Sequence, residues 1–378
     1  MKKYLELGAL ILSLVTYIKG NSQSLETMKY RGVVYDVGLQ YNPGQLSVDS
    51  FNAERVKYDM AVIAKELHAN AVRIEGETIS RLVIATQAAH DAGLKVLFNP
   101  WKMNADAEET IEYMAEAAIE AEQLRKKGID LVFVTGCEYT IFSRGAFPGE
   151  TFQERVAFMT QHGGEKSLGG KKIPAFEEAS KKLNEILGKV TDRVRENFRG
   201  LVTYSSGPWE NADWTKFDIV GIDYYRTTES AEEYVSNLKK FRRNKKPLIV
   251  MEVGSCTYEG AGKLGPGGFA ILQGVNPDGT IIFKDGKVPI RSEKEQADYV
   301  ETQVNLLHEG GADGIFVFVF AFPVMPYIGE GNRDFDMVTF SLVKSFWKGD
   351  VRSQKIPNWE KKEAFDRLSK VYMEIQKK

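Results

Sequence analysis

The sequence has few of the residues that bind transition metals or form disulfide bonds. Its 378 residues include two cysteines and four histidines, and neither a C-x-x-C pair nor an H-E-x-x-H motif occurs. Structural zinc sites, disulfide-rich scaffolds and zinc-protease chemistry are therefore disfavoured. The net charge of −2 shows no excess of basic residues of the kind that binds nucleic acid. From these absences we expect no metal, no cofactor and no nucleic-acid partner.

The chain also lacks an apolar run long enough to predict a membrane span, which requires about 20 residues. Two lysines precede a shorter apolar stretch near the N-terminus, as in a secretory signal, but Glu6 interrupts it and no clear cleavage site follows. We interpret residues 1–29 as an N-terminal helical segment and expect a cytoplasmic protein. The alternative is secretion, with residues 1–24 as a signal peptide. The sequence leaves the oligomeric state open.

From residue 30 onward, short apolar runs alternate with segments of helical periodicity. The runs that predict strands span residues 31–37, 71–74, 95–98, 130–134, 201–204, 217–222, 248–253 and 314–320. The helical patterns span residues 51–68, 79–92, 106–127, 174–198, 230–243, 292–309 and 361–375. Fully apolar strands are typical of a parallel sheet covered by helices, and eight such units are what a (β/α)8 barrel requires. A doubly wound open sheet is disfavoured because no G-x-G-x-x-G turn follows the first strand.

Two longer segments interrupt this alternation. Residues 147–173, after the fourth strand, are polar and contain two glycine pairs, so we expect a loop insertion. Residues 254–291, after the seventh strand, contain two Asp-Gly dipeptides around a TIIF segment, which predicts a small hairpin. No domain linker is evident. We therefore predict one α/β protein, a (β/α)8 TIM barrel over residues 30–378, with loop insertions after strands 4 and 7.

Two glutamates follow apolar runs at the ends of predicted strands, where barrel enzymes place their active residues. Glu138 follows VFVTGC after the fourth strand, and Glu252 follows LIVM in the seventh. A structural ion pair with Arg73 on the second strand would explain one such glutamate. Two of them on strands across the barrel favour catalysis, because paired carboxylates are typical of glycoside hydrolysis. Glu138 and Glu252 are therefore the candidate catalytic residues.

Other polar and aromatic residues at the predicted strand ends are candidates for binding a carbohydrate substrate. They are Arg73, Asp36, Asn99, Trp101, Tyr204, Trp209, Asp223, Tyr224, Tyr225 and Phe322. The rings of Trp101, Trp209, Tyr224, Tyr225 and Phe322 could stack on sugar rings. Core or rim packing is the alternative for each aromatic residue.

This layout resembles clan A of the glycoside hydrolases, a set of retaining (β/α)8 enzymes. The resemblance assigns the acid/base to Glu138 in VFVTGCEYTIF and the nucleophile to Glu252 in PLIVMEVGS. It also matches Arg73 in AVRIEGE and Tyr225, or Tyr224, in VGIDYYR. The runs RGVVYDVG, HANAVRI, FVTGCEYTIFSRG and DFDMVTFSLVK are similar to those of uncharacterised barrel proteins labelled "abortive infection protein", over about residues 30–375. The sequence departs from the clan where Cys137 stands in place of the usual asparagine.

The resemblance implies retaining hydrolysis of a glycosidic bond in an oligo- or polysaccharide. Arg73 would favour the ionised form of Glu252, and Tyr225 would orient the same carboxylate. Glu138, in more apolar surroundings, would begin protonated. The alternative is a non-catalytic carbohydrate-binding or phage-defence-associated protein that retains the barrel.

Overall fold

The computed structural model describes residues 28–41, 44–162, 174–243, 245–329 and 331–377. Most of the predicted N-terminal segment therefore lies outside the described residues, as does part of the first insertion. Within the described ranges, no helix combines the length and apolarity that a membrane span needs.

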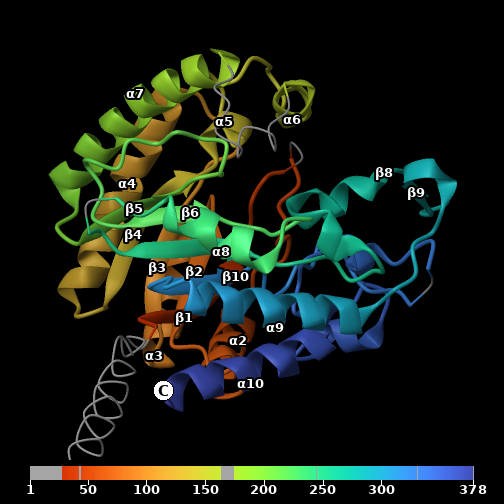
Figure 1. The fold of residues 1–378 in the computed structure, drawn as a ribbon. Helices are drawn as coiled ribbons and strands as arrows, with labels where there is room; N and C mark the ends of the chain where they lie inside the picture. The colour runs from red at the N-terminus through yellow and green to blue at the C-terminus, as the bar shows by residue number, and fades with distance from the viewer. Residues whose placement is uncertain (1–27, 42–43, 163–173, 244, 330, 378) are drawn as a thin grey trace, which may run out of the picture.

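The core of the fold is a parallel sheet rolled into a barrel (Figure 1). Among the described residues its strands are β1 (Tyr30–Asp36), β2 (Ala71–Gly76), β3 (Lys95–Pro100), β4 (Leu131–Cys137), β5 (Leu201–Ser205), β6 (Val220–Asp223), β7 (Leu248–Val253) and β10 (Gly314–Val317). Their order is β5-β4-β3-β2-β1-β10-β7-β6. A parallel bridge between Ser206 and Ile222 joins the two end strands and closes the barrel. The predicted (β/α)8 architecture is thereby confirmed.

Helices cover the outside of the sheet. They are α2 (Ala53–Lys65), α3 (Ile79–Asp91), α4 (Ala107–Lys126), α7 (Pro174–Asn197), α8 (Ala231–Lys239), α9 (Glu293–Glu309) and α10 (Glu363–Lys377). In Figure 1, α7 lies beside α4, and α10 lies along α9 below the barrel. The helices begin at side-chain caps that the sequence supplies, such as Asn52 for α2 and the Asp106/Glu109 capping box of α4.

The insertion after β4 is not the pure loop that we expected. It contains α6 (Phe152–Gln161), which begins at a capping box formed by Thr151 and Glu154. Its apolar residues pack with Phe147 and Phe176 in a small separate core. The capping signal and this local core explain why a segment with many polar residues still forms a helix.

The second insertion carries the expected hairpin, and a further hairpin follows the barrel. Strands β8 (Leu272–Val275) and β9 (Ile281–Phe283) pair antiparallel and extend away from the barrel in Figure 1. Strands β11 (Val343–Ser345) and β12 (Trp359–Lys361) form a second two-stranded sheet. In the segment after β10, Asp334 and Asp336 form ion pairs with Arg291 at 2.8 and 2.9 Å.

Side chains inside the barrel change character along the strands. The lower interior is an apolar cluster that includes Val34, Leu97 and Phe316. Toward the carboxyl ends of the strands, acidic and amide side chains replace it. The parallel register aligns Asp36 with Glu75, Glu75 with Asn99, and Asp223 with Glu252. The barrel therefore places a polar layer on an apolar floor, at the end where barrel enzymes hold their sites.

Packing inside the barrel requires glycine at position 32. This residue pairs with Phe316 across β1 and β10, and a Cβ atom at Gly32 would lie 2.3 Å from the Phe316 ring. Phe316 is fully buried, so its ring has no free space into which to move. We expect Gly32→Ala to lower the free energy of unfolding by about 1–3 kcal/mol, measured by urea denaturation.

Gly267→Ala is the matched control, because nothing lies within 4 Å of a Cβ atom there. Its free energy of unfolding should stay within about 0.5 kcal/mol of the wild type. Equal effects of the two substitutions would contradict this description of the barrel interior.

Candidate active site

Glu138 is positioned by an irregular turn at the end of β4. Gly136 has φ +94°, and a Cβ atom there would lie 2.3 Å from the Tyr139 ring. Glu138 itself adopts the left-handed conformation, with φ 41° and ψ 50°, and its N–H donates to Ser205 O at 2.9 Å. A non-glycine residue in this region is uncommon and costs energy. The turn therefore holds the Glu138 backbone in one conformation at the mouth of the barrel.

A buried carboxylate, Glu210, anchors the residues that follow Glu138. Its Oε1 accepts from the N–H and the hydroxyl of Thr140 at 3.0 and 2.7 Å. Its Oε2 accepts from Ser206 Oγ at 3.1 Å and from the Tyr204 hydroxyl at 3.0 Å. The Tyr204 hydroxyl also accepts from Tyr139 N–H at 2.7 Å. Glu210 therefore ties the turn after β4 to the end of β5.

Glu252 receives two directional contacts, one on each carboxylate oxygen. Arg73 Nη1 lies 2.8 Å from Glu252 Oε1, and the Tyr225 hydroxyl donates to Oε2 at 2.9 Å. Arg73 is fully buried, and its Nε donates to Asn99 Oδ1 at 2.8 Å. The Glu252 side chain keeps 11% exposure, whereas that of Arg73 has none. The buried Arg73 side chain therefore holds in place a Glu252 carboxylate that is itself partly exposed.

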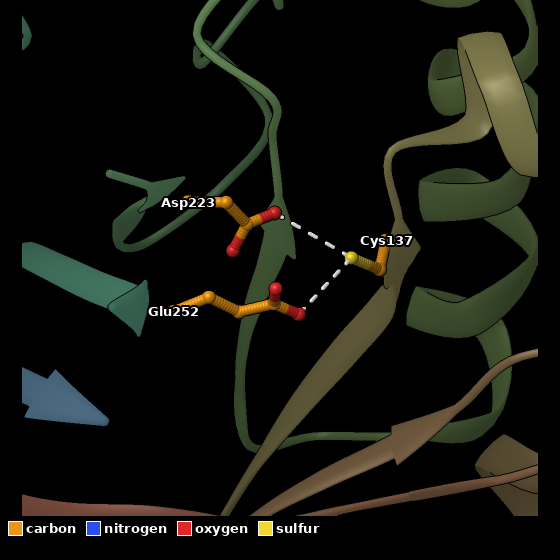
Figure 2. Close-up of side chains that lie close together, drawn as sticks. All are labelled: Cys137, Asp223 and Glu252. Atoms are coloured by element: carbon orange, nitrogen blue, oxygen red, sulfur yellow. Dashed lines mark hydrogen bonds between the residues drawn. The ribbon is translucent and has the colours of Figure 1, made fainter. Parts of the chain in front are cut away.

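A thiol and a second carboxylate lie beside Glu252. Figure 2 shows Cys137 Sγ donating to Asp223 Oδ2 at 3.5 Å and to Glu252 Oε1 at 3.7 Å. Ser205 Oγ donates to the other Asp223 oxygen at 2.7 Å. One ligand atom from each of Cys137, Asp223 and Glu252 lies within 4.8 Å of the other two. Burial raises the pKa of the Cys137 thiol well above its usual value, and the charges of Asp223 and Glu252 raise it further.

Acidic side chains outnumber cations in this layer of the barrel. The Glu75 carboxylate lies 3.2 Å from Arg73 Nη2, and its own side chain is 1% exposed. Burial raises the pKa of Glu75 well above its usual value, and the neighbouring carboxylates Glu252, Asp36 and Asp223 raise it further. Burial likewise raises the pKa of Asp36 to about 6. Arg73 is thus shared between Glu252 and Glu75.

Glu138 has different surroundings from Glu252. Among the described residues, its side chain has no hydrogen-bond or ion-pair partner. Burial raises the pKa of Glu138 well above its usual value, and the negative charges of Asp223, Glu252 and Glu210 add to this. The site therefore contains one carboxyl group that favours its protonated form and one carboxylate that Arg73 and Tyr225 hold.

The remaining residues predicted at the strand ends divide into three groups. The first group lies in the polar layer with Glu252 and consists of Arg73, Asp36, Asn99, Asp223 and Tyr225. Trp209 Nε1 donates to Thr140 and Phe322 packs against Tyr41, so both lie at the periphery of this group.

Three aromatic residues on the candidate list have almost no exposed ring. Trp101 is 2% exposed and packs edge-on against Phe142. Tyr204 is fully buried in the core between strands and helices. Tyr224 stacks on Tyr234, and its hydroxyl donates to Tyr234 O. In this structure these rings fill the core, which was the alternative for each, and the Tyr225 hydroxyl rather than that of Tyr224 contacts the Glu252 carboxylate.

Two residues with clear roles in the site were absent from the predicted set. Glu75 ends a predicted strand, but strand position alone gives it no function. Glu210 follows a Pro-Trp dipeptide in a loop, and no local pattern indicates that five donors would converge on it. Both roles depend on contacts between segments far apart in the chain, such as the 70 residues between Thr140 and Glu210.

Comparison with solved structures shows that this fold is shared with glycoside hydrolases. A GH113 β-1,4-mannanase aligns with a TM-score of 0.57 and 15% identity over 92% of this chain and 99% of its own. The GH113 β-mannanase AaManA from Alicyclobacillus acidocaldarius aligns with a TM-score of 0.53 and 16% identity, covering 93% and 100%. The family 5 enzyme PbGH5A from Prevotella bryantii B14 gives 0.52 and 13%, covering 92% and 98%.

No protein-family model and no curated protein matches the sequence. The expected similarity to proteins labelled "abortive infection protein" therefore has no support from these comparisons. The fold is a (β/α)8 barrel of the kind found in these glycoside hydrolases.

The Glu210 network should contribute to stability because it satisfies several buried donors. Glu210→Gln places an NH2 group against hydroxyl and N–H donors and leaves at least one of them unpaired. We expect this substitution to lower the free energy of unfolding by about 1–3 kcal/mol, measured by urea denaturation. Glu116→Gln on the exposed side of α4 is the control, with a change within about 0.5 kcal/mol. No difference between the two variants would show that the network is not stabilising.

Proposed function

We propose that this protein is a glycoside hydrolase that cleaves a glycosidic bond in an oligo- or polysaccharide with retention of configuration. The observation that carries the proposal is the difference between the surroundings of two carboxyl groups, one after β4 and one on β7, on strands across the barrel. Glu252 is bound by a buried guanidinium and a tyrosine hydroxyl, whereas Glu138 has no side-chain partner among the described residues and its pKa is raised. Pairs of carboxyl groups whose environments separate their pKa values are typical of acid and nucleophile assignments.

Glu252 is the proposed nucleophile. Arg73 Nη1 lies 2.8 Å from its Oε1, and the Tyr225 hydroxyl donates to its Oε2 at 2.9 Å, so both oxygens are held in place. One oxygen attacks the anomeric carbon and forms a glycosyl-enzyme ester, while the leaving sugar departs with its oxygen. Arg73 is also paired with Glu75. The guanidinium therefore keeps one counter-ion when Glu252 becomes an ester.

Glu138 is the proposed general acid and base. In the first step its proton passes to the departing glycosidic oxygen, which otherwise would leave as an alkoxide. In the second step the same group, now ionised, takes a proton from water as that water attacks the ester. The ester has by then removed the negative charge of Glu252, which helps Glu138 to lose its proton.

The fold comparison supports a carbohydrate as the substrate class. The aligned structures include β-1,4-mannanases and a family 5 glycoside hydrolase, at 13–16% identity. The β-mannans are therefore a rational first polysaccharide to test, together with a panel of aryl glycosides that covers other sugars and both anomers.

The assignment predicts unequal losses for two conservative variants. Glu252→Gln should abolish turnover on every substrate, because the amide cannot form the ester. Glu138→Gln should lose about 10²–10⁴-fold on substrates with a poor leaving group. The rate of the first step should fall much less on dinitrophenyl glycosides, because their leaving group needs no proton. Initial rates on both substrate types provide the measurement.

Glu116→Gln should retain wild-type rates, as expected for an exposed side chain on helix α4. Proton NMR of the first product distinguishes retention from inversion. Full activity of Glu252→Gln would contradict the nucleophile assignment, and an inverted first product would contradict the retaining mechanism. A protein that binds oligosaccharides but hydrolyses none of the panel would instead support the alternative of a non-catalytic carbohydrate-binding barrel.

The raised pKa of Glu138 sets the expected pH dependence. Its acid form is present below the pKa and is lost as the pH rises through it, so kcat/KM should fall on the alkaline side. The fall should be absent in the residual activity of Glu138→Gln, which has no titrating proton at that position. If kcat/KM of this variant still fell on the alkaline side, the fall would be due to another titrating group.

A further inference from the structure

Three potential metal ligands meet at the ends of β4, β6 and β7. Cys137 Sγ lies 3.5 Å from Asp223 Oδ2 and 3.7 Å from Glu252 Oε1 (Figure 2). In a tetrahedral zinc site, Zn–S is about 2.3 Å and Zn–O about 2.0 Å, which separates sulfur and oxygen ligands by about 3.5 Å. The two sulfur–oxygen distances are close to this value, and all three ligand atoms lie within 4.8 Å of one another.

The charge around the three ligands points to a cation as well. Asp223 is fully buried and forms no ion pair with any described residue; it accepts only from Ser205 and Cys137. Glu75 adjoins the cluster through Arg73, and neither of its buried oxygens has a hydrogen-bond partner among the described residues. Arg73 thus serves Glu252 and Glu75 together, and no cation among the described residues pairs with Asp223.

We propose that Cys137, Asp223 and Glu252 form a binding site for a thiophilic divalent cation such as Zn²⁺ or Cd²⁺. The thiol proton leaves to solvent as the sulfur–metal bond forms, and water occupies the fourth position. The thiolate ligand favours these ions over Mg²⁺ and Ca²⁺, which prefer oxygen ligands. Arg73 and Tyr225 remain on the Glu252 oxygens and orient that ligand from outside the metal's coordination shell.

The consequence for activity rests on the proposed function. A cation on Glu252 Oε1 engages the nucleophile and occupies the space where the sugar must approach. Zn²⁺ and Cd²⁺ should therefore inhibit hydrolysis reversibly, and a chelator should restore it. Mg²⁺ and Ca²⁺ at the same concentration should leave the rate unchanged.

Cobalt spectroscopy on the full-length protein tests the site without any need for activity. Co²⁺ bound to a thiolate gives a near-ultraviolet charge-transfer band that oxygen ligands do not give. We expect this band in the wild type, its displacement by Zn²⁺, and its loss in Cys137→Ser. Cys256→Ser is the matched control, because Cys256 is the other buried free thiol and contacts Val338 O instead. A wild type without the band, or a band that depends on Cys256, would overturn the proposal.

Asp223→Asn keeps both thiols and provides a second test if Cys137→Ser does not fold. It should keep the sulfur band and lose about tenfold or more in Co²⁺ affinity. Unchanged affinity would overturn the role of Asp223 as a ligand. The spectroscopic result stands whether or not hydrolysis is found, so failure of the site and failure of the proposed function are distinguishable. In an active enzyme, Zn²⁺ that binds without inhibiting would overturn the placement of the ion on the nucleophile.

Discussion

The ion pair between Arg73 and Glu252 is the interaction on which the arrangement of the barrel mouth depends. A buried guanidinium is costly unless its donors are satisfied, and here Asn99, Met251 O, Glu252 and Glu75 surround it. Because the pair joins β2 to β7 across the barrel, it also determines where the Glu252 carboxylate lies. Tyr225 and Cys137 then approach oxygens whose positions are already defined.

The second constraint is the excess of negative charge in a small buried volume. Asp36, Glu75, Asp223 and Glu252 occupy one layer, and Glu138 lies at its rim. Water is largely excluded from this layer, so carboxylates that lack a cation favour their protonated forms. Burial thus raises the pKa of Glu138 at the rim, whereas Arg73 and Tyr225 hold the Glu252 carboxylate.

Much of this architecture could be predicted from the sequence, because periodicity and strand ends are local properties. The eight apolar runs predicted the eight strands, and barrel closure follows from their number. The run 217–222 began too early, since β6 starts at Val220, and the run 314–320 ended too late, since β10 stops at Val317. Both errors have one cause: residues beside a strand remain apolar when they are buried. The helix α6 was missed because its small core includes Phe176, outside the insertion.

The sequence by itself determined the order of strands and helices and the positions of Arg73, Glu138, Glu252 and Tyr225 at the strand ends. Alternation of apolar and polar residues is sufficient for this, because each strand end in a parallel barrel faces the same side. Only the tertiary structure decided which side chains meet. It placed the Tyr225 hydroxyl rather than that of Tyr224 on the Glu252 carboxylate. It also buried Trp101 and Tyr204, and it brought Glu210 and Asp223 to the turn after β4. These contacts join segments separated by tens of residues, and no local pattern encodes the distance between two strands.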